Sequence, residues 1–254
     1  MGGEHGRKAL RRLGQRRLPG VGGDGDARER DAKVVARRIA AEEDIEGLTL
    51  AAVARGVGVT PPALYRYFNG RAGLVRAIYD DITAEFIDTV DRAVRRQASD
   101  DLSAQLHAGT HAVLEWSVAN KVEFDLLMGA GYAKVAESEE GIPVVIAREL
   151  GGLFGRLFAR LWDEGRLTCP ADEEIDPVLA AQLRTYRSEV GLKFPIGVAF
   201  LMVVCWRQIY GLVCMAVYGH HGFAFDDPQP LFEQMIDDLL GLLGLTRSPG
   251  LRLS

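Results

Sequence analysis

Cysteine is scarce in this 254-residue chain, and its scarcity limits the class of protein. Cys169, Cys205 and Cys214 are too few and too scattered for a disulfide framework, and they form no paired-cysteine zinc spacing. The first residues contain charges but lack the apolar run that a secretion signal needs. We therefore expect a protein of a reducing compartment, the cytoplasm.

Alternation of apolar and polar residues, the pattern of a half-buried β-strand, is also missing over any useful length. What remains is a series of helical patterns, several of which have a proline near the expected start. The expected helices cover residues 27–44, 50–57, 62–67, 71–97, 102–120, 122–127, 143–164, 177–190, 195–218 and 230–243. The predicted fold class is all-α.

A membrane span is suggested only by residues 195–218, which form the longest apolar stretch. Arg207 lies in its centre, where an arginine costs about 2.5–3.5 kcal/mol for insertion. A helix that is apolar on most sides is more simply explained as one buried between neighbouring helices. We expect no membrane contact.

Acidic residues are absent between Glu46 and Asp80, although they are plentiful elsewhere. This window contains four arginines: Arg55, Arg66, Arg71 and Arg76. Residues 1–80 carry 15 Lys and Arg against 10 Asp and Glu, whereas residues 81–254 carry 15 against 25. A surface without carboxylates is suited to binding an anion, and duplex DNA is the obvious candidate.

The same window has the pattern of two short helices joined by a tight turn. Thr49 is expected to cap the first helix, Gly58 to end it in the left-handed conformation, and Thr60 to cap the second. Pro61 then occupies the first helical position, where its missing N–H costs nothing. An apolar seam would join the helices: Val53, Ala54, Val57, Val59, Leu64 and Phe68. This is the geometry of a helix-turn-helix, whose second helix enters the major groove of DNA.

Eight residues of this motif are candidates for DNA contact: Thr49, Thr60, Pro61, Ala63, Tyr65, Arg66, Tyr67 and Arg71. The threonines would direct helix N-termini toward phosphates, and the tyrosine hydroxyls can reach phosphate oxygens. Arg66 can either bind a guanine edge or hold a phosphate. Pro61 and Ala63 could pack on a thymine methyl, and Arg71 would clamp the DNA backbone beside Tyr67.

The stretch from Leu48 to Leu74 resembles the DNA-binding domain of TetR/AcrR-family transcriptional regulators. The resemblance is strongest at Val-Gly-Val-Thr (57–60) and Leu-Tyr-Arg-Tyr-Phe (64–68). The chain departs from the family at Arg37, where a large apolar residue is usual. The resemblance implies an N-terminal three-helix DNA-binding domain, an all-helical effector-binding domain, and a homodimer on a palindromic operator. In that family, the positions that match the eight candidates touch DNA.

We expect four parts along the chain. Residues 1–26 form a basic, Gly-rich, disordered arm, 27–75 the helix-turn-helix domain (the reader), 76–245 a larger helical effector-binding and dimerisation domain (the body), and 246–254 a C-terminal tail. The basic residues of the arm are Arg7, Lys8, Arg11, Arg12, Arg16 and Arg17. They would enter the minor groove beside the reader, or else belong to an inert tail.

The last two expected helices carry more apolar surface than one neighbour can cover. Residues 200–218 leave almost no polar face, and the apolar stripe of the final helix is again wide. Such surface is best buried against a second copy of the chain, in a two-fold four-helix interface. The segment from Trp206 to His220 also resembles the WHG-type C-terminal domain of a subset of TetR regulators, with Tyr210 where His usually precedes Gly.

An effector site is expected in the body, where aromatic residues and a few polar groups share the same helices. The candidates are His107, His111, Trp116, Phe158, Trp162, Trp206, Gln208 and Tyr210. Their mixture predicts a small, largely apolar ligand. Any single one of the aromatic residues is better explained as ordinary core.

A metal site is the alternative for some of these residues. His107, His111 and Glu115 lie four residues apart on one helix face, a spacing found in metal sites, although a further ligand would be needed. The chain has neither a nucleophile elbow nor a phosphate loop, so we expect no enzymatic activity and no cofactor.

The sequence thus predicts a homodimeric, sequence-specific DNA-binding regulator. Like most members of the family that it resembles, it would be a repressor, released from its operator by a small apolar effector. The alternative is a DNA-binding regulator that responds to no effector.

Overall fold

The computed structural model describes residues 24–129, 131–132, 135, 142–220 and 222–249, and these contain helices but no β-strand. The elements are α2 (Asp24–Gly47), α3 (Leu50–Val57), α4 (Pro61–Leu64), α5 (Gly70–Arg95), α6 (Leu102–Ala119), α7 (Lys121–Met128), α9 (Ile142–Asp163), the 3₁₀ turn η1 (Asp172–Glu174), α10 (Pro177–Val190), α11 (Ile196–Val217) and α12 (Gln229–Leu242). The all-α fold class is confirmed, with helix ends that differ from the expected ones by a few residues. The basic residues of the expected arm lie outside the described residues.

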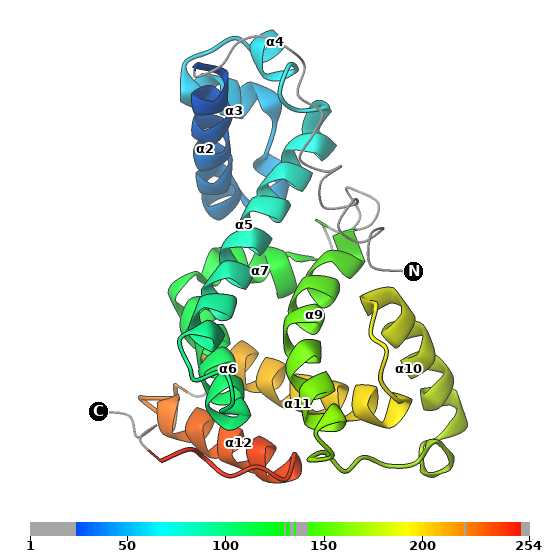
Figure 1. The fold of residues 1–254 in the computed structure, drawn as a ribbon. Coiled ribbons are helices and arrows are strands. Elements are labelled where there is room, and N and C mark those ends of the chain that lie inside the picture. Colours follow the sequence, from blue (N-terminus) through cyan, green and yellow to red (C-terminus); the bar gives the residue numbers. More distant parts are fainter. Residues whose placement is uncertain (1–23, 130, 133–134, 136–141, 221, 250–254) are drawn as a thin grey trace.

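The reader forms a small bundle at one end of the molecule (Figure 1). Ala32 and Ala36 of α2, Val53 and Ala54 of α3, and Leu64 of α4 are almost completely buried in it. The small alanines allow α2 and α3 to approach closely, so that the short helices share one apolar core.

One continuous helix, α5, joins the reader to the body (Figure 1). Leu74 and Ile78 of its N-terminal half are buried against the reader, and Phe86 and Val90 of its C-terminal half are buried in the body. In the body α5 packs mainly along α6. A displacement of α6 is therefore felt directly by the helix that carries the reader.

Arg37 on α2 takes part in this junction through charge rather than apolar contact. Its Nη2 lies 3.1 Å from Oδ2 of Asp81, and its Nη1 lies 2.8 Å from Oε2 of Glu85, both on α5. Lys33, one turn earlier on α2, lies 3.6 Å from Asp81 as well. The departure from the family at Arg37 is thus accommodated by ion pairs that tie α2 to the middle of α5.

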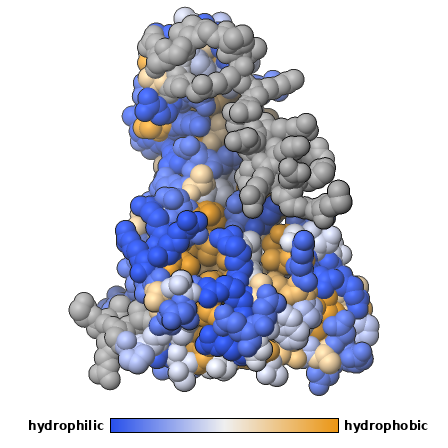
Figure 2. Space-filling model, in the orientation of Figure 1, coloured by the Kyte–Doolittle hydropathy of each residue, from blue (hydrophilic) through white to orange (hydrophobic). Residues whose placement is uncertain are grey.

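The body is built around α11, which packs against α6, α9, α10 and α12. Within the part of the chain that the structure describes, α11 alone is long and apolar enough to cross a membrane. Its N-terminal half is largely buried by these neighbours, whereas Met215 and Tyr218 near its C-terminus are 40% and 42% exposed. In Figure 2, hydrophilic residues cover most of the visible face, and apolar residues show mainly in gaps on the body.

Residues 246–248 pack on the body. Ser103 Oγ donates a hydrogen bond to the carbonyl of Thr246 (2.6 Å), and Ser248 Oγ donates one to Oδ1 of Asp101 (2.7 Å). Asp101 also caps α6 by accepting from the N–H of Ala104. The boundary expected at residue 246 therefore falls within a segment that fastens the end of α12 to the start of α6.

Candidate functional site

The turn of the helix-turn-helix is formed as the sequence predicts. Thr49 Oγ1 accepts a hydrogen bond from the N–H of Ala52 at 3.1 Å, which satisfies an otherwise unpaired amide at the start of α3. Gly58 ends α3 with a φ of 76°, in the left-handed region that favours glycine. The next residue, Val59, then donates its N–H to the carbonyl of Ala54 at 2.9 Å, which turns the chain into α4.

Thr60 occupies the cap position of α4, but its hydroxyl makes no capping hydrogen bond. The two amides that such a hydroxyl could receive are those of the second and third helical residues. Pro62 has no N–H, and the N–H of Ala63 already donates to the carbonyl of Thr60 at 2.9 Å. The expected side-chain cap is therefore wrong, and Thr60 is an exposed residue.

The second helix is shorter than expected, because α4 ends at Leu64 and continues as a turn. The N–H groups of Tyr67 and Phe68 both donate to the carbonyl of Leu64, at 2.9 and 3.0 Å. Leu64 and Phe68 are buried, which fixes the turn on the core of the reader. Tyr65, 62% exposed, and Arg66 project to solvent between them.

Arg66 presents a free guanidinium on this surface. Its Cζ lies 6.0 Å from the centre of the half-buried Tyr67 ring, at the limit of a cation–π contact. Among the described residues neither Arg66 nor Arg55 has an ion-pair partner, whereas Arg76 pairs with Asp80 at 2.8 Å. Thr60, Pro61, Tyr65 and Arg66 are thus exposed together, and the surrounding sequence has no carboxylate.

Arg71 is partly used inside the reader. Its Nε donates to the carbonyl of Leu48 at 2.9 Å, and its Nη2 donates to the carbonyl of Ile45 at 2.6 Å. These carbonyls lie at the C-terminal end of α2, where a cation also interacts favourably with the helix dipole. Any contact of Arg71 with a DNA phosphate would use its remaining donors.

The body contains a cavity of about 310 Å³. Its described walls come from α6, α7, α9, α10, α11 and α12, together with Tyr132 and Leu243, and none of these lining residues belongs to α5. Three of the eight effector candidates, Phe158, Trp206 and Tyr210, line it.

The other five candidates lie elsewhere. Trp116 packs on Phe86 of α5, with ring centres 4.7 Å apart, and Trp162 is 37% exposed near the end of α9. Gln208 follows Trp206 by two residues, which places it on another face of α11, and it is exposed. His107 and His111 face α12 instead of the cavity.

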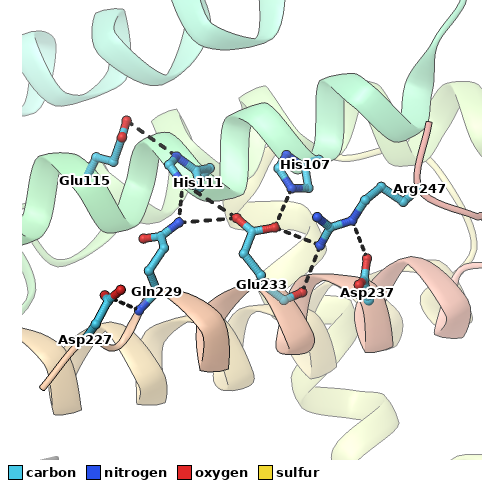
Figure 3. Close-up of polar contacts among 8 residues, drawn as sticks. All are labelled: His107, His111, Glu115, Asp227, Gln229, Glu233, Asp237 and Arg247. Carbon is cyan, nitrogen blue, oxygen red and sulfur yellow. Dashed lines mark hydrogen bonds and ion pairs between the residues drawn. The ribbon is translucent and has the colours of Figure 1, made fainter. Parts of the chain in front are cut away.

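A buried polar cluster explains the position of both histidines (Figure 3). His107 Nε2 lies 2.9 Å from Oε2 of Glu233, and His111 Nε2 lies 3.6 Å from Oε1 of the same carboxylate. Arg247 Nη2 binds Oε2 of Glu233 at 2.7 Å, and Gln229 also contacts both His111 and Glu233. The cluster joins α6, α12 and the segment after α12.

This arrangement gives no support to the metal-binding alternative. His111 Nδ1 lies 3.5 Å from Glu115, but the ring of His107 is directed to Glu233. In the parts of the chain that the structure describes, no group of three or more His, Cys, Asp or Glu residues has a geometry that could hold a metal ion.

The polar groups of the cavity are held in their neutral forms. Burial raises the pKa of the Cys205 thiol to about 12, and burial also raises the pKa of the Tyr132 and Tyr186 hydroxyls. Tyr210, whose pKa is raised chiefly by burial, donates its hydroxyl to the carbonyl of Met128. Tyr186 could not be found from the sequence, because its place in the cavity depends on how α10 packs on α9.

Comparisons with known proteins agree with this architecture. Residues 34–78 match the family described as bacterial regulatory proteins, tetR family, and residues 106–239 match the tetracyclin repressor-like C-terminal domain. The HTH-type transcriptional regulator Rv1816 of Mycobacterium tuberculosis is 29% identical over 231 residues, which cover 88% of this chain and 96% of that protein. The regulator Mb1846 of Mycobacterium bovis matches equally well.

Solved structures show the same fold. The regulatory protein SCO4313 has a TM-score of 0.66 at 24% identity, covering 85% of this chain and 97% of its own. RolR in complex with resorcinol has a TM-score of 0.51 at 16% identity, covering 87% and 89%. Since the match to the C-terminal domain alone spans more than half of the chain, the protein belongs to the TetR family of bacterial transcriptional regulators, which are helix-turn-helix DNA-binding proteins and not enzymes.

Proposed function

We propose that this regulator is a repressor that binds a palindromic operator as a homodimer and leaves it when a small, largely apolar effector enters the cavity of the body. The observation that carries the proposal is the pairing of two features on one chain. An exposed, carboxylate-free reader surface lies at one end of α5, and a cavity with apolar walls lies in the body beside the other end.

The reader would use its exposed residues in two ways. Thr60, Pro61, Ala63, Tyr65 and Arg66 are the candidates for contacts inside the major groove, where Arg66 would face a guanine edge or a phosphate. Thr49, Tyr67 and Arg71 would hold the flanking phosphates, Arg71 with the donors that α2 leaves free. Arg7, Lys8, Arg11, Arg12, Arg16 and Arg17 remain a proposed minor-groove contact.

Dimerisation would use the outer faces of α11 and α12. Met215, Tyr218 and Leu242 leave apolar side chains exposed there. At Gly211 on α11 and Gly241 on α12, an added Cβ would meet no atom within 4 Å, so these positions are open to the approach of another chain. A two-fold dimer places two readers about 34–36 Å apart, on successive major grooves.

Signal transfer would pass through α6, because the described walls of the cavity include α6 but not α5. At Gly109 on α6, an added Cβ would lie only 2.9 Å from Val94 of α5 and 3.4 Å from the ring of Phe154, which lines the cavity. The contact from Phe154 through Gly109 to Val94 is thus tight. An effector that displaces Phe154 would move α5 and change the spacing of the two readers. For this to act as a switch, the effector must bind the displaced state more tightly by about 1–3 kcal/mol.

A release experiment tests this proposal. Small molecules are screened by thermal shift, and each one that binds is then added to the complex of protein and operator at moderate salt, with fluorescence anisotropy as the readout. We expect at least one ligand that both stabilises the protein and releases the DNA. Ligands that stabilise the protein yet never release DNA would refute the switch. Such a regulator acts on the chromosome, so we also place the protein in the cytoplasm.

A further inference from the structure

We propose that the effector is an uncharged, mainly apolar molecule with one hydrogen-bonding end, and that the hydroxyl groups of Tyr132 and Tyr186 receive this end. The inference rests on the proposed function, because it specifies the ligand of the same cavity. It concerns the chemical class of the ligand, which the family does not determine.

The walls of the cavity offer no partner for a charge. None of the described residues that line it is Asp, Glu, Lys, Arg or His. On α6 and α12, His107 and Glu233 do not line the cavity: they pair with each other, and Glu233 also pairs with Arg247. An ionised ligand would lose its hydration in the cavity and gain no counter-charge in return, which strongly disfavours its binding.

Tyr132 and Tyr186 each contribute a hydroxyl group to the wall of the cavity. Tyr132 precedes α9, and Tyr186 on α10 reaches α9 at Gly151, where its hydroxyl oxygen lies 3.4 Å from the position that a Cβ would take. The contribution from α12 is purely aliphatic: Ile236, Leu239 and Leu240. In Figure 1, α10 and α12 lie on opposite sides of α9 and α11. A mainly aliphatic wall that also carries a few hydroxyl groups suits a ligand with one polar end and an apolar body.

The hydroxyl groups of Tyr132 and Tyr186 are available to a ligand. The Tyr210 hydroxyl is already bonded to the carbonyl of Met128. Among the described residues, by contrast, neither Tyr132 nor Tyr186 has a hydrogen-bond partner for its hydroxyl. Burial raises the pKa of both groups, so they remain protonated and can donate as well as accept.

Three matched probes test the inference on the full chain: 4-butylphenol, butylbenzene and 4-butylbenzoate. They share one apolar body and differ in carrying a neutral polar end, no polar end, or a negative charge at neutral pH. Isothermal titration calorimetry should show that 4-butylphenol binds tightest and that 4-butylbenzoate binds at least about tenfold more weakly than the phenol. Binding of the benzoate as tight as that of the phenol, or failure of both neutral probes to bind, would overturn the inference.

Variants assign the hydroxyl groups. The double variant Tyr132→Phe/Tyr186→Phe should bind 4-butylphenol about fivefold more weakly, because a hydrogen bond is lost, while its affinity for butylbenzene stays within about twofold. A merely structural effect would weaken both probes alike. The matched control is Thr185→Val on the exposed face of α10, whose hydroxyl donates to the carbonyl of Ala181 outside the cavity and whose loss should change neither affinity.

These outcomes are independent of DNA. Calorimetry measures the ligand alone, whereas failure of the protein to bind an operator would refute the proposed function and leave the probe affinities untouched. Equal affinity of the double variant and the unaltered protein for 4-butylphenol would refute the role of the two tyrosines.

Discussion

His107 and Glu233 form a buried pair across the interface of α6 and α12, with 2.9 Å between Nε2 and Oε2. The same carboxylate binds Arg247 at 2.7 Å, and Arg247 Nε in turn lies 2.7 Å from Oδ1 of Asp237. Glu233 is therefore the common acceptor for α6 and for the segment that follows α12 (Figure 3). Its role is to fasten α12, which the proposed dimer uses.

Glu233→Ala should destabilise the protein. The change leaves the buried His107 without its acceptor and removes one of the two carboxylates that pair with Arg247, so we expect a loss of about 1.5–3 kcal/mol in the free energy of unfolding. Chemical denaturation measures it. Gln234→Ala, at the exposed neighbouring position, is the control and should be nearly neutral. A loss no larger than that of the control would mean that the cluster contributes little to stability.

Arg71→Ala should lower both stability and DNA affinity. The variant removes two hydrogen bonds to the carbonyls of Ile45 and Leu48, which should cost about 1.5–3 kcal/mol and lower the melting temperature. Arg55→Ala, an exposed arginine of the same surface, should leave the melting temperature unchanged. If Arg71→Ala weakens DNA binding but leaves the melting temperature unchanged, Arg71 contributes to DNA binding and not to the stability of the fold.

Arg66→Ala and Tyr67→Phe should affect DNA binding differently. If Arg66 reads a guanine, its loss relaxes the preference at one base position and costs about 1–3 kcal/mol on the operator. Tyr67→Phe removes a phosphate contact and should weaken binding to all duplexes alike. Competition between operator and random duplex separates the two effects. Equal losses on both duplexes for Arg66→Ala would make Arg66 a phosphate contact.

Gly211→Arg should prevent dimerisation without unfolding the monomer. The position has space within the chain, so the new side chain disturbs only a partner that packs on α11. Gly152→Arg on α9 is equally free of neighbours within 4 Å and serves as the control. Analytical ultracentrifugation should find a dimer for the control and a monomer for Gly211→Arg. A dimeric Gly211→Arg would exclude this face of α11 from the interface.

Gly109→Ala should weaken operator binding in the absence of effector. Its Cβ would come within 2.9 Å of a side-chain methyl of Val94, so we expect Val94, and α5 with it, to shift relative to α6. By the coupling proposed above, the free energy of operator binding should become less favourable by about 1–3 kcal/mol. Gly152→Ala is the matched control, and fluorescence anisotropy is the measurement. Unchanged affinity would show that the switch does not use the contact between Gly109 and Val94.

Local signals in the sequence predict the reader well. Thr49 and Gly58 act within a few residues of themselves, so the cap and the turn follow from neighbouring residues. The burial of Leu64 and Phe68 is likewise predicted by their spacing of four residues, which places them on one helix face. Thr60 failed as a side-chain cap because Pro62 and the bond of Ala63 remove both donors, a detail that the general preference for threonine does not contain.

The cavity could not be predicted in the same way. Histidine at positions 107 and 111 is a reasonable ligand-binding group, but Glu233, more than a hundred residues away, directs both side chains to α12. Tyr186 reaches the cavity from α10, where its hydroxyl lies beside Gly151 of a different helix, α9. Such partners are set by tertiary packing, which neither helical periodicity nor composition records.

Selection of bound fragments from a random DNA pool, at moderate salt, tests the central claim most directly. The account predicts an enriched inverted repeat whose half-sites are centred about one helical turn, 34–36 Å, apart. The account would be contradicted if no sequence were enriched over the starting DNA pool and the protein were also found to be a monomer.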